Sequence, residues 1–504
     1  MTVKRTLRAF MLLAGLAFVS SRAQAIDCSN LPTEFTGNEF PHGNFFSNFQ
    51  NSCYTIPLTK GYGGSGAMGD LDTVYYRLFL KADPRYQLII VGAFPQARYF
   101  SITVNDEHLG VAQSILDVNI APLNSHYINP FQPGAAFVGG QRYAVPVDFG
   151  GYPGKIQNGC KMDGFNVEVN KLDATLRHVG IDWNNDAGFF EKYPATPRHV
   201  VDTPEHTNPN KAGTVLIRSY LDVTPRDPKT SAYVIVRDVA SGCGLPAAYV
   251  MNTLQVVATK PTVGNSWLDT AQINTHLNYQ NSYRPQSCYA HDPQNQLVWL
   301  RSGEYVASPN PFSSYLLATI PAGLPANLAA AGRVMRMRFR IPETPPTPCT
   351  NGCYRSGEEE MRYMSLSFLG SATLATLADS VFTKDTDGYV TLIVSTGAAI
   401  PAWITPENGY TFLNLAAIDG WNQLERLLLR DIIPAGTFSC ASDVVPYSTA
   451  EDTPEGGLMG EYLPVVDFPA AISLPPVAEP LAHPDSCAIL PVGQPGVWPN
   501  CGIF

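Results

Sequence analysis

The sequence predicts a mainly β protein in which two antiparallel, jelly-roll-like β-sandwich domains follow one another along the chain. Three observations lead to this fold class: the composition, the pattern of strands and an internal repeat. Only 15% of the residues are charged, whereas Tyr and Phe number 24 each, Gly 41 and Pro 42. Few charges combined with many aromatic and turn-forming residues suit short strands better than amphipathic helices.

Runs of β-branched and aromatic residues, most of them ended by Gly, Pro, Asp or Asn, predict strands along most of the chain. Helical windows are few, at 325–332 and 421–430, and the second could equally end as a strand. The predicted strands are 73–80, 86–91, 99–104, 232–237, 297–300, 334–341, 364–368 and 389–394.

Four features recur in the same order in the two halves and predict a divergent duplication, with chance similarity among strands as the alternative. They are an apolar strand (87–91 and 335–341), an Arg-Tyr-x-Ser strand (98–101 and 362–365), an Asp-Gly-aromatic step (163–165 and 387–389), and an apolar strand that reaches an arginine (Arg218 and Arg430).

The segments Arg98–Thr103 and Asp387–Leu392 resemble strands of a family of exported bacterial proteins of unknown function. The β-sandwich of that family is built around an aromatic-Trp/Tyr-Ser-x-Thr strand, an Asp-Gly-x-Val-x-Leu strand and a final apolar strand with Arg. Here Tyr replaces the usual Trp, and the first half carries long insertions. The resemblance implies an architecture alone, because the family has no established activity.

The N-terminus predicts a secretory signal peptide over residues 1–25. Three basic residues precede an apolar run at 9–19, and Ala23-Gln24-Ala25 provides the small-x-small pattern that is cleaved after Ala25. The apolar run is about half of the length that a membrane span requires. We therefore expect a secreted or periplasmic protein without a membrane span.

The formal charge of the whole chain is −10, and removal of the signal makes it more acidic because that segment carries only basic charges. An acidic surface repels phosphate backbones and anionic lipid, so nucleic acid and an anionic membrane surface are excluded as expected partners. The oligomeric state is not readable from the sequence.

The mature part is too long for one ordinary core, and this predicts two domains, 26–250 and 251–440. A Pro-rich C-terminal extension, 441–504, follows them. All ten cysteines lie in the mature part, and an even number in an exported chain favours disulfides over metal thiolates. The expected local bridges are Cys28–Cys53, Cys487–Cys501 and, with tighter geometry, Cys349–Cys353.

Arg336, Arg338 and Arg340 alternate with apolar residues, so a strand would place the three guanidinium groups on one face. In one interpretation they pair with Glu358–Glu360 across a hairpin. In the other they form a ligand-binding row for a carboxylate or sulfate.

Asp106, Glu107 and His108 gather polar groups at the end of a predicted strand. They are candidate acid/base residues, although a solvated turn explains them equally. A G-x-G-x-x-G string at 61–66 lacks the following helix that a dinucleotide site needs. The loop at 384–388 lacks the later ligands of a calcium site. No cofactor and no metal are predicted.

Two functions of different classes follow from these features. The first is a binding or structural protein that recognises a glycan or a partner protein. The alternative is a glycosidase-like hydrolase of an extracellular polymer, which would need a pair of carboxylates in a cleft between the domains. A flat, exposed aromatic strip would favour binding.

Overall fold

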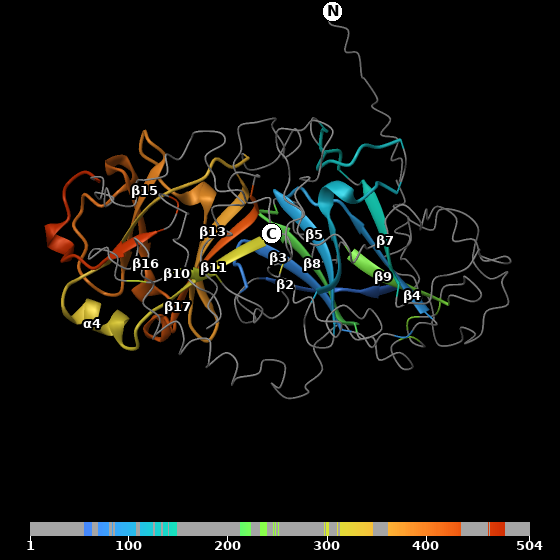
Figure 1. Cartoon of the computed structure of the whole chain (residues 1–504), viewed down its shortest axis with the longest axis horizontal. Helices are drawn as coiled ribbons and strands as arrows, with labels where there is room; N and C mark the ends of the chain where they lie inside the picture. Colours follow the sequence, from blue (N-terminus) through green and yellow to red (C-terminus); the bar gives the residue numbers. More distant parts are fainter. Residues whose placement is uncertain are drawn as a thin grey trace, which may run out of the picture.

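The computed structural model describes residues 55–148 and 212–238 with gaps, a few positions between 245 and 310, then 313–345, 361–434 and 462–478. These residues form two β-sandwiches that lie side by side along the longest axis of the molecule (Figure 1). The mainly β fold and the antiparallel sheets predicted from the sequence are confirmed.

The first sandwich packs a four-stranded sheet, in the order β1-β9-β4-β7, on a five-stranded sheet, in the order β2-β3-β8-β5-β6. Its elements are β1 (Thr55–Pro57), β2 (Thr59–Tyr62), β3 (Thr73–Phe79), β4 (Tyr86–Ala93), β5 (Tyr99–Asp106), β6 (Val111–Leu116), the 3-10 turn η2 (Asp117–Asn119), β7 (Arg142–Asp148), β8 (Ala212–Tyr220) and β9 (Ala232–Asp238).

The second sandwich repeats this plan with the five-stranded order β10-β11-β17-β13-β14 and the four-stranded order β16-β15-β12-β18. Its strands are β10 (Trp299–Arg301), β11 (Ser313–Thr319), β12 (Met335–Arg340), β13 (Met361–Leu369), β14 (Thr373–Ala378), β15 (Tyr389–Ser395), β16 (Tyr410–Asn414), β17 (Arg426–Pro434) and β18 (Val465–Asp467). Its helical elements are α4 (Leu324–Ala330), η4 (Asp379–Val381), η5 (Pro406–Asn408), η6 (Leu415–Ala417), η7 (Trp421–Gln423) and η9 (Ala471–Ser473).

The two five-stranded sheets correspond strand for strand, and their members follow the same sequence along the chain. β2, β3, β5, β6 and β8 of the first sheet match β10, β11, β13, β14 and β17 of the second. Residue pairing also agrees, since Ser101 lies opposite Arg218 and Ser365 lies opposite Arg430. Such a correspondence is what duplication of one domain produces. Of the four recurring features, only the step at 163–165 lies outside the described residues.

Three details differ from the simplest expectation. β16 runs parallel to β15, so the second four-stranded sheet is not wholly antiparallel. β18, which comes from the predicted C-terminal extension, pairs with β12 and belongs to the second sandwich. The window 421–430 divides into η7 and β17, whereas the predicted helix near 325–332 forms as α4.

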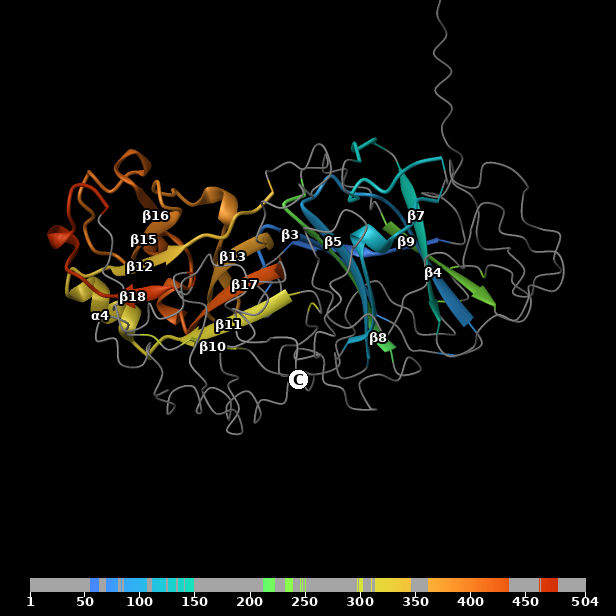
Figure 2. The same ribbon diagram turned by 45° about the horizontal axis from the view of Figure 1, so that its top comes forward.

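The five-stranded sheets meet at the centre of the molecule, and the four-stranded sheets lie on the outer sides (Figures 1 and 2). We call them the inner and outer sheets. One apolar core fills each sandwich between its inner and outer sheet. β13 alternates polar and apolar side chains, yet all nine of its residues are buried. Its apolar face packs in the core and its polar face contacts the other sandwich, so both faces are covered.

None of the helices in the described part of the chain is long and apolar enough to cross a membrane.

Candidate functional site

We call the surface where the two inner sheets meet the interface. It contains a buried polar network. Its aromatic centre crosses from one sandwich to the other, because the rings of Tyr220 and Tyr363 lie 5.0 Å apart. Ile432 and Ala378 of the second sandwich also pack into the core cluster of the first. The two sandwiches are therefore joined by shared packing as well as by polar contacts.

Two buried ion pairs cross the interface reciprocally. Arg98 of the first sandwich pairs with Asp379 of the second at 2.5 Å, and Arg362 of the second pairs with Asp117 of the first at 2.7 Å. Each arginine lies at the start of an inner strand, and each aspartate begins a 3-10 turn after the next strand. Each arginine thus pairs with the aspartate of the opposite sandwich. The two pairs occupy matching positions in the two repeats, as equivalent contacts do in an isologous dimer interface.

Backbone groups complete the coordination of both carboxylates. Asp117 accepts hydrogen bonds from the amides of Phe100 and Val118, at 2.8 and 2.6 Å, and Asp379 accepts one from Met364 at 3.1 Å. Burial raises the pKa of both aspartates, while the facing arginines oppose this shift. The ion pairs therefore hold the two sandwiches in one orientation at a considerable desolvation cost.

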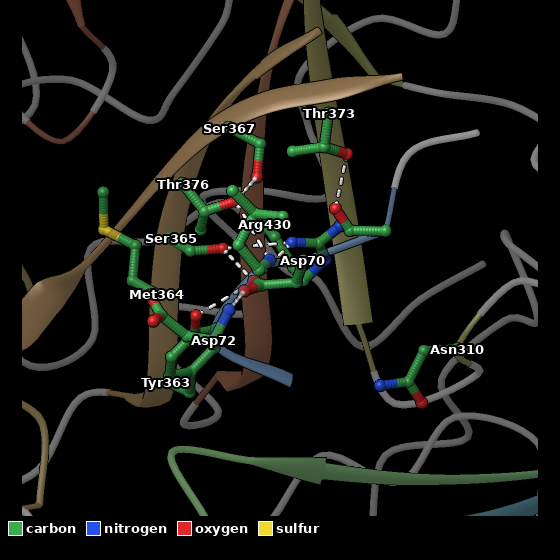
Figure 3. A network of polar contacts seen from close by, with 12 residues as sticks. Asp70, Asp72, Asn310, Tyr363, Met364, Ser365, Ser367, Thr373, Thr376 and Arg430 are labelled. Carbon is green, nitrogen blue, oxygen red and sulfur yellow. Dashed lines mark hydrogen bonds and ion pairs between the residues drawn. The ribbon is translucent and has the colours of Figure 1, made fainter. Parts of the chain in front are cut away.

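Asp70, which lies just before β3, forms the most connected point of the interface (Figure 3). One of its carboxylate oxygens, Oδ2, accepts hydrogen bonds from the hydroxyl of Tyr363 at 2.9 Å, the hydroxyl of Ser365 at 2.7 Å and Nη1 of Arg430 at 2.6 Å. The donors come from β13 and β17 of the other sandwich. We call these four residues the Asp70 node.

Asn310 occupies the matching place before β11. We define the Asn310 node as Asn310 with Tyr99, Ser101 and Arg218, which stand at the strand positions that match Tyr363, Ser365 and Arg430. The backbone amides of Asp70 and Asn310 each donate to the hydroxyl oxygen of the tyrosine five residues later, at 3.1 Å in both halves. The Tyr99 hydroxyl donates to Asn310 Oδ1 at 2.8 Å, as Tyr363 does to Asp70. The two nodes share one geometry but differ in charge.

The edge of the Asp70 node carries a further acid. Burial together with the neighbouring charges of Asp70 and Asp379 raises the pKa of Asp72 to about 6. Asp70, Asp117 and Asp379 are at most 3% exposed, and each carboxylate contacts an arginine. These three carboxylates have no access to a polymer outside the protein, so their arrangement suits positioning of the sandwiches and not acid/base chemistry.

The predicted arginine row lies on β12, where each member has an internal contact. Arg336 forms a bidentate pair with Asp467 of β18, at 2.9 and 2.5 Å. Arg338 pairs with Asp385 at 2.5 Å, and the guanidinium of Arg340 lies 5.4 Å from the centre of the Tyr462 ring. β12 and β13 do not form the hairpin of the first interpretation, because β13 belongs to the inner sheet while β12 pairs with β15 and β18; Glu358–Glu360 lie outside the described residues.

Other predicted residues cannot be placed. Asp106 ends β5, but its side chain, Glu107 and His108 lie outside the described residues. The same is true of residues 1–25 and of all ten cysteines, including the pairs Cys28–Cys53, Cys349–Cys353 and Cys487–Cys501. Within the described ranges no group of three or more His, Cys, Asp or Glu side chains could hold a metal.

Sequence reasoning marked Arg98, Arg362, Arg218 and Arg430 as repeated positions but not as interface residues. It missed Asp70, Asp117, Asp379 and Asn310 altogether. The available signal was the alternation in 363–367, where Tyr, Ser and Ser share one strand face. An arginine opposite such a face on the neighbouring strand indicates a buried polar surface rather than a solvated one.

A second surface covers the outer sheet of the second sandwich. The segments 398–404 and 471–478 pack on this sheet around Val334, Ile393 and Tyr410. They are tied together, since the Trp403 indole donates to the Leu474 carbonyl at 3.3 Å. Four apolar side chains on this cover and on β16 stay exposed, and we call them the outer patch: Trp403 (38%), Phe412 (40%), Ile472 (83%) and Val477 (60%).

Comparisons with known proteins provide no function. No known protein family and no curated protein matches the chain. Among solved structures it is similar to a putative uncharacterized protein from Burkholderia cenocepacia, with 10% identity, a TM-score of 0.39, and coverage of 85% of this chain and 84% of that one. It is also similar to the VPA0106 protein from Vibrio parahaemolyticus, with 11% identity, a TM-score of 0.32 and coverage of 79% and 88%.

Proposed function

We propose that the protein is exported and binds a partner protein through the outer patch, with the two sandwiches acting as a rigid support. The observation that carries this function is the exposure of Trp403, Phe412, Ile472 and Val477 around one covered sheet. Several large apolar side chains exposed on one surface are typical of protein-binding sites. A mixture of aromatic and aliphatic groups suits the apolar centre of such an interface.

The contacts below the patch support this role because they keep the cover in place. The Tyr410 hydroxyl donates to the Pro475 carbonyl at 2.9 Å, and the Ala478 amide donates to the Asn408 carbonyl at 2.9 Å. Asn408 in turn donates from its side chain to the Trp403 carbonyl at 2.8 Å. A surface held in its bound shape loses less conformational entropy on association.

A glycan ligand is the other outcome of the same experiment. Aliphatic Ile472 and Val477 cannot stack on a sugar ring, so they favour a protein partner over a glycan. The hydrolase alternative needs an accessible carboxylate pair, and the three interface carboxylates paired with arginines are buried.

The test is a binding screen of the purified, oxidised, full-length protein against arrays of exported proteins and of glycans, with a parallel assay for released reducing sugars. For a protein ligand found this way, Trp403→Ala and Ile472→Ser should each weaken binding roughly tenfold or more, as for central interface residues. Ile128→Ser is the matched control, because Ile128 is 63% exposed on the first sandwich. A ligand whose affinity is unchanged by both outer-patch variants, or sugar release by the repurified protein, would reject the proposal.

A further inference from the structure

β16 (Tyr410–Asn414) leaves one edge of the second outer sheet unpaired. It ends the strand order β16-β15-β12-β18 and pairs with β15 alone. Among the described residues, no other backbone-to-backbone hydrogen bond involves Thr411–Asn414. Alternate residues of a strand direct their amide and carbonyl groups to opposite sides. β16 therefore presents a row of unpaired hydrogen-bonding groups along its outer edge.

The corresponding edge of the first sandwich is protected. β7 occupies the place of β15, since it pairs with β4 as β15 pairs with β12. The segment before β7 covers the start of its free side, where Pro122 forms a bridge with Tyr143. The Leu123 amide also donates to the Arg142 carbonyl at 2.7 Å. β7 contains Pro146, which has no amide hydrogen for a further strand, and both features are common means of protecting a sheet edge.

The sequence of β16 carries none of the residues that usually protect an edge strand. It reads Tyr-Thr-Phe-Leu-Asn and contains no proline, glycine or charged residue. Phe412 is 40% exposed and Asn414 is also exposed, so solvent reaches the strand at both residues. Phe412 is one of the four residues of the outer patch, and the apolar surface thus continues to the unpaired edge.

We propose that the partner protein contributes an extended segment, which pairs with the outer edge of β16 and adds a strand to the outer sheet. This inference rests on the proposed function, because it uses the same surface. An extended segment fits since its amide and carbonyl groups face sideways, whereas an α-helix uses these groups internally. Main-chain pairing of this kind is a general mode of peptide recognition.

The two faces of β16 also specify the side chains of the added segment. Tyr410 packs in the cluster below the cover, whereas Leu413 packs against the core of the second sandwich. Because successive side chains point to opposite faces, Phe412 shares the outer face with Tyr410. Alternate side chains of an added strand would lie beside Phe412, and we expect these to be apolar. The others should be uncharged, because β16 offers no charge to pair with them.

The test uses a phage-displayed library of random linear peptides, selected against the purified, oxidised, full-length protein. Peptides that bind are synthesised with one N-methylated amide at a time, and the dissociation constant of each is measured. Strand pairing predicts that methylation weakens binding roughly tenfold at alternate residues, because each of these loses one hydrogen bond. The residues between them should tolerate methylation. Equal sensitivity of neighbouring residues, or no sensitivity, would overturn strand addition.

Two variants locate the peptide on the protein. Phe412→Lys introduces an edge lysine, which natural edge strands use against pairing, and should weaken peptide binding by roughly tenfold or more. Ile128→Lys is the matched control, because it replaces another exposed apolar side chain, on the first sandwich, and should leave binding unchanged. Hydrogen exchange of the wild type is a second measurement that needs no variant. With peptide bound, amides of β16 should exchange more slowly, whereas those of β7 should not change.

The outcomes separate strand addition from the proposed function. Peptides that are weakened by Trp403→Ala but show no alternation would leave the outer patch as a binding surface and overturn strand addition. If Phe412→Lys weakens no selected peptide, strand addition is also overturned, whereas the array of exported proteins tests the outer patch independently. Self-association of the protein that Phe412→Lys abolishes would assign the edge to a second copy of this chain instead.

Discussion

The Asp70 and Asn310 nodes are two versions of one arrangement, and they differ mainly in a single side chain. In both, a loop residue of one sandwich accepts a hydrogen bond from a tyrosine hydroxyl of the other, and a serine and an arginine stand at matching positions of the strands. One loop residue is a carboxylate and the other an amide. The comparison shows that the two surfaces share one geometry while their charge differs.

The divergence has local consequences on each side. On the Asp70 side, burial and the neighbouring charges of Asp70 and Asp379 raise the pKa of Asp72 to about 6. On the Asn310 side the Ser101 hydroxyl finds no acceptor among the described residues. In contrast, the reciprocal pairs Arg98–Asp379 and Arg362–Asp117 have the same chemistry in both halves. These two pairs should therefore contribute most to holding the interface.

The largest expected effect is on the reciprocal ion pairs. Arg362→Met leaves Asp117 buried without its cation and should lower the free energy of unfolding by about 3–5 kcal/mol, with a similar loss for Arg98→Met. Urea unfolding measures both. Arg426→Met is the control, because Arg426 forms only a 3.4 Å pair with the exposed Glu425 and should cost less than about 1 kcal/mol. Unequal losses for the two interface arginines would show that the two ion pairs do not contribute alike to stability.

A comparable effect is expected from Asp431, whose counterpart in the first sandwich is Ser219. Asp431 is fully buried and its carboxyl has no hydrogen-bond partner within the described structure. Burial raises its pKa from 3.8 to about 7.

Because the folded-state pKa of Asp431 is above the unfolded value, stability is highest below the unfolded pKa and falls as the pH rises through about 7. Asp431→Asn should remove about 3–4 kcal/mol of this pH dependence. Urea unfolding midpoints measured from about pH 4 to about pH 8, which covers the interval between these two pKa values, test this prediction. Identical pH profiles for the wild type and the variant would show that Asp431 is not buried as a neutral acid.

Asp70→Asn gives the Asp70 node the same uncharged side chain as the Asn310 node. We expect an intermediate loss of stability. The variant removes the negative charge that Arg430 contacts, and should cost about 2–3 kcal/mol in urea unfolding. A loss of stability as small as that of a surface substitution would indicate that the charge of Asp70 does not stabilise the fold.

The smallest effect is expected for Asp72. Its pKa of about 6 exceeds the unfolded value of 3.8, so its ionisation destabilises the fold as the pH rises from acidic values through about 6. Asp72→Asn should therefore raise stability at pH 7 by less than about 1 kcal/mol, because partial exposure screens the charge. The two proteins should be equally stable in acid. A gain that grows towards low pH would have the wrong sign for this mechanism.

The strand pattern was predictable because it depends on local alternation and on turn residues. The segment 389–394 alternates poorly but is rich in β-branched residues, and it became β15. The arginine row of β12 was correctly placed on one face, but its partners were not predicted. Asp467 lies 131 residues from Arg336 in sequence, and nothing local indicates that β18 returns to pair with β12.

The sequence by itself determined the class of fold, the repeated order of strands and the equivalence of Arg98 with Arg362 and of Arg218 with Arg430. Each of these depends on neighbours within one strand or on comparison of two segments. The tertiary structure alone decided that the polar faces of β5 and β13 contact the other sandwich, and that each arginine pairs with the aspartate of the opposite half. Those contacts depend on how two complete sandwiches dock, because residues hundreds of positions apart become neighbours only after both have folded.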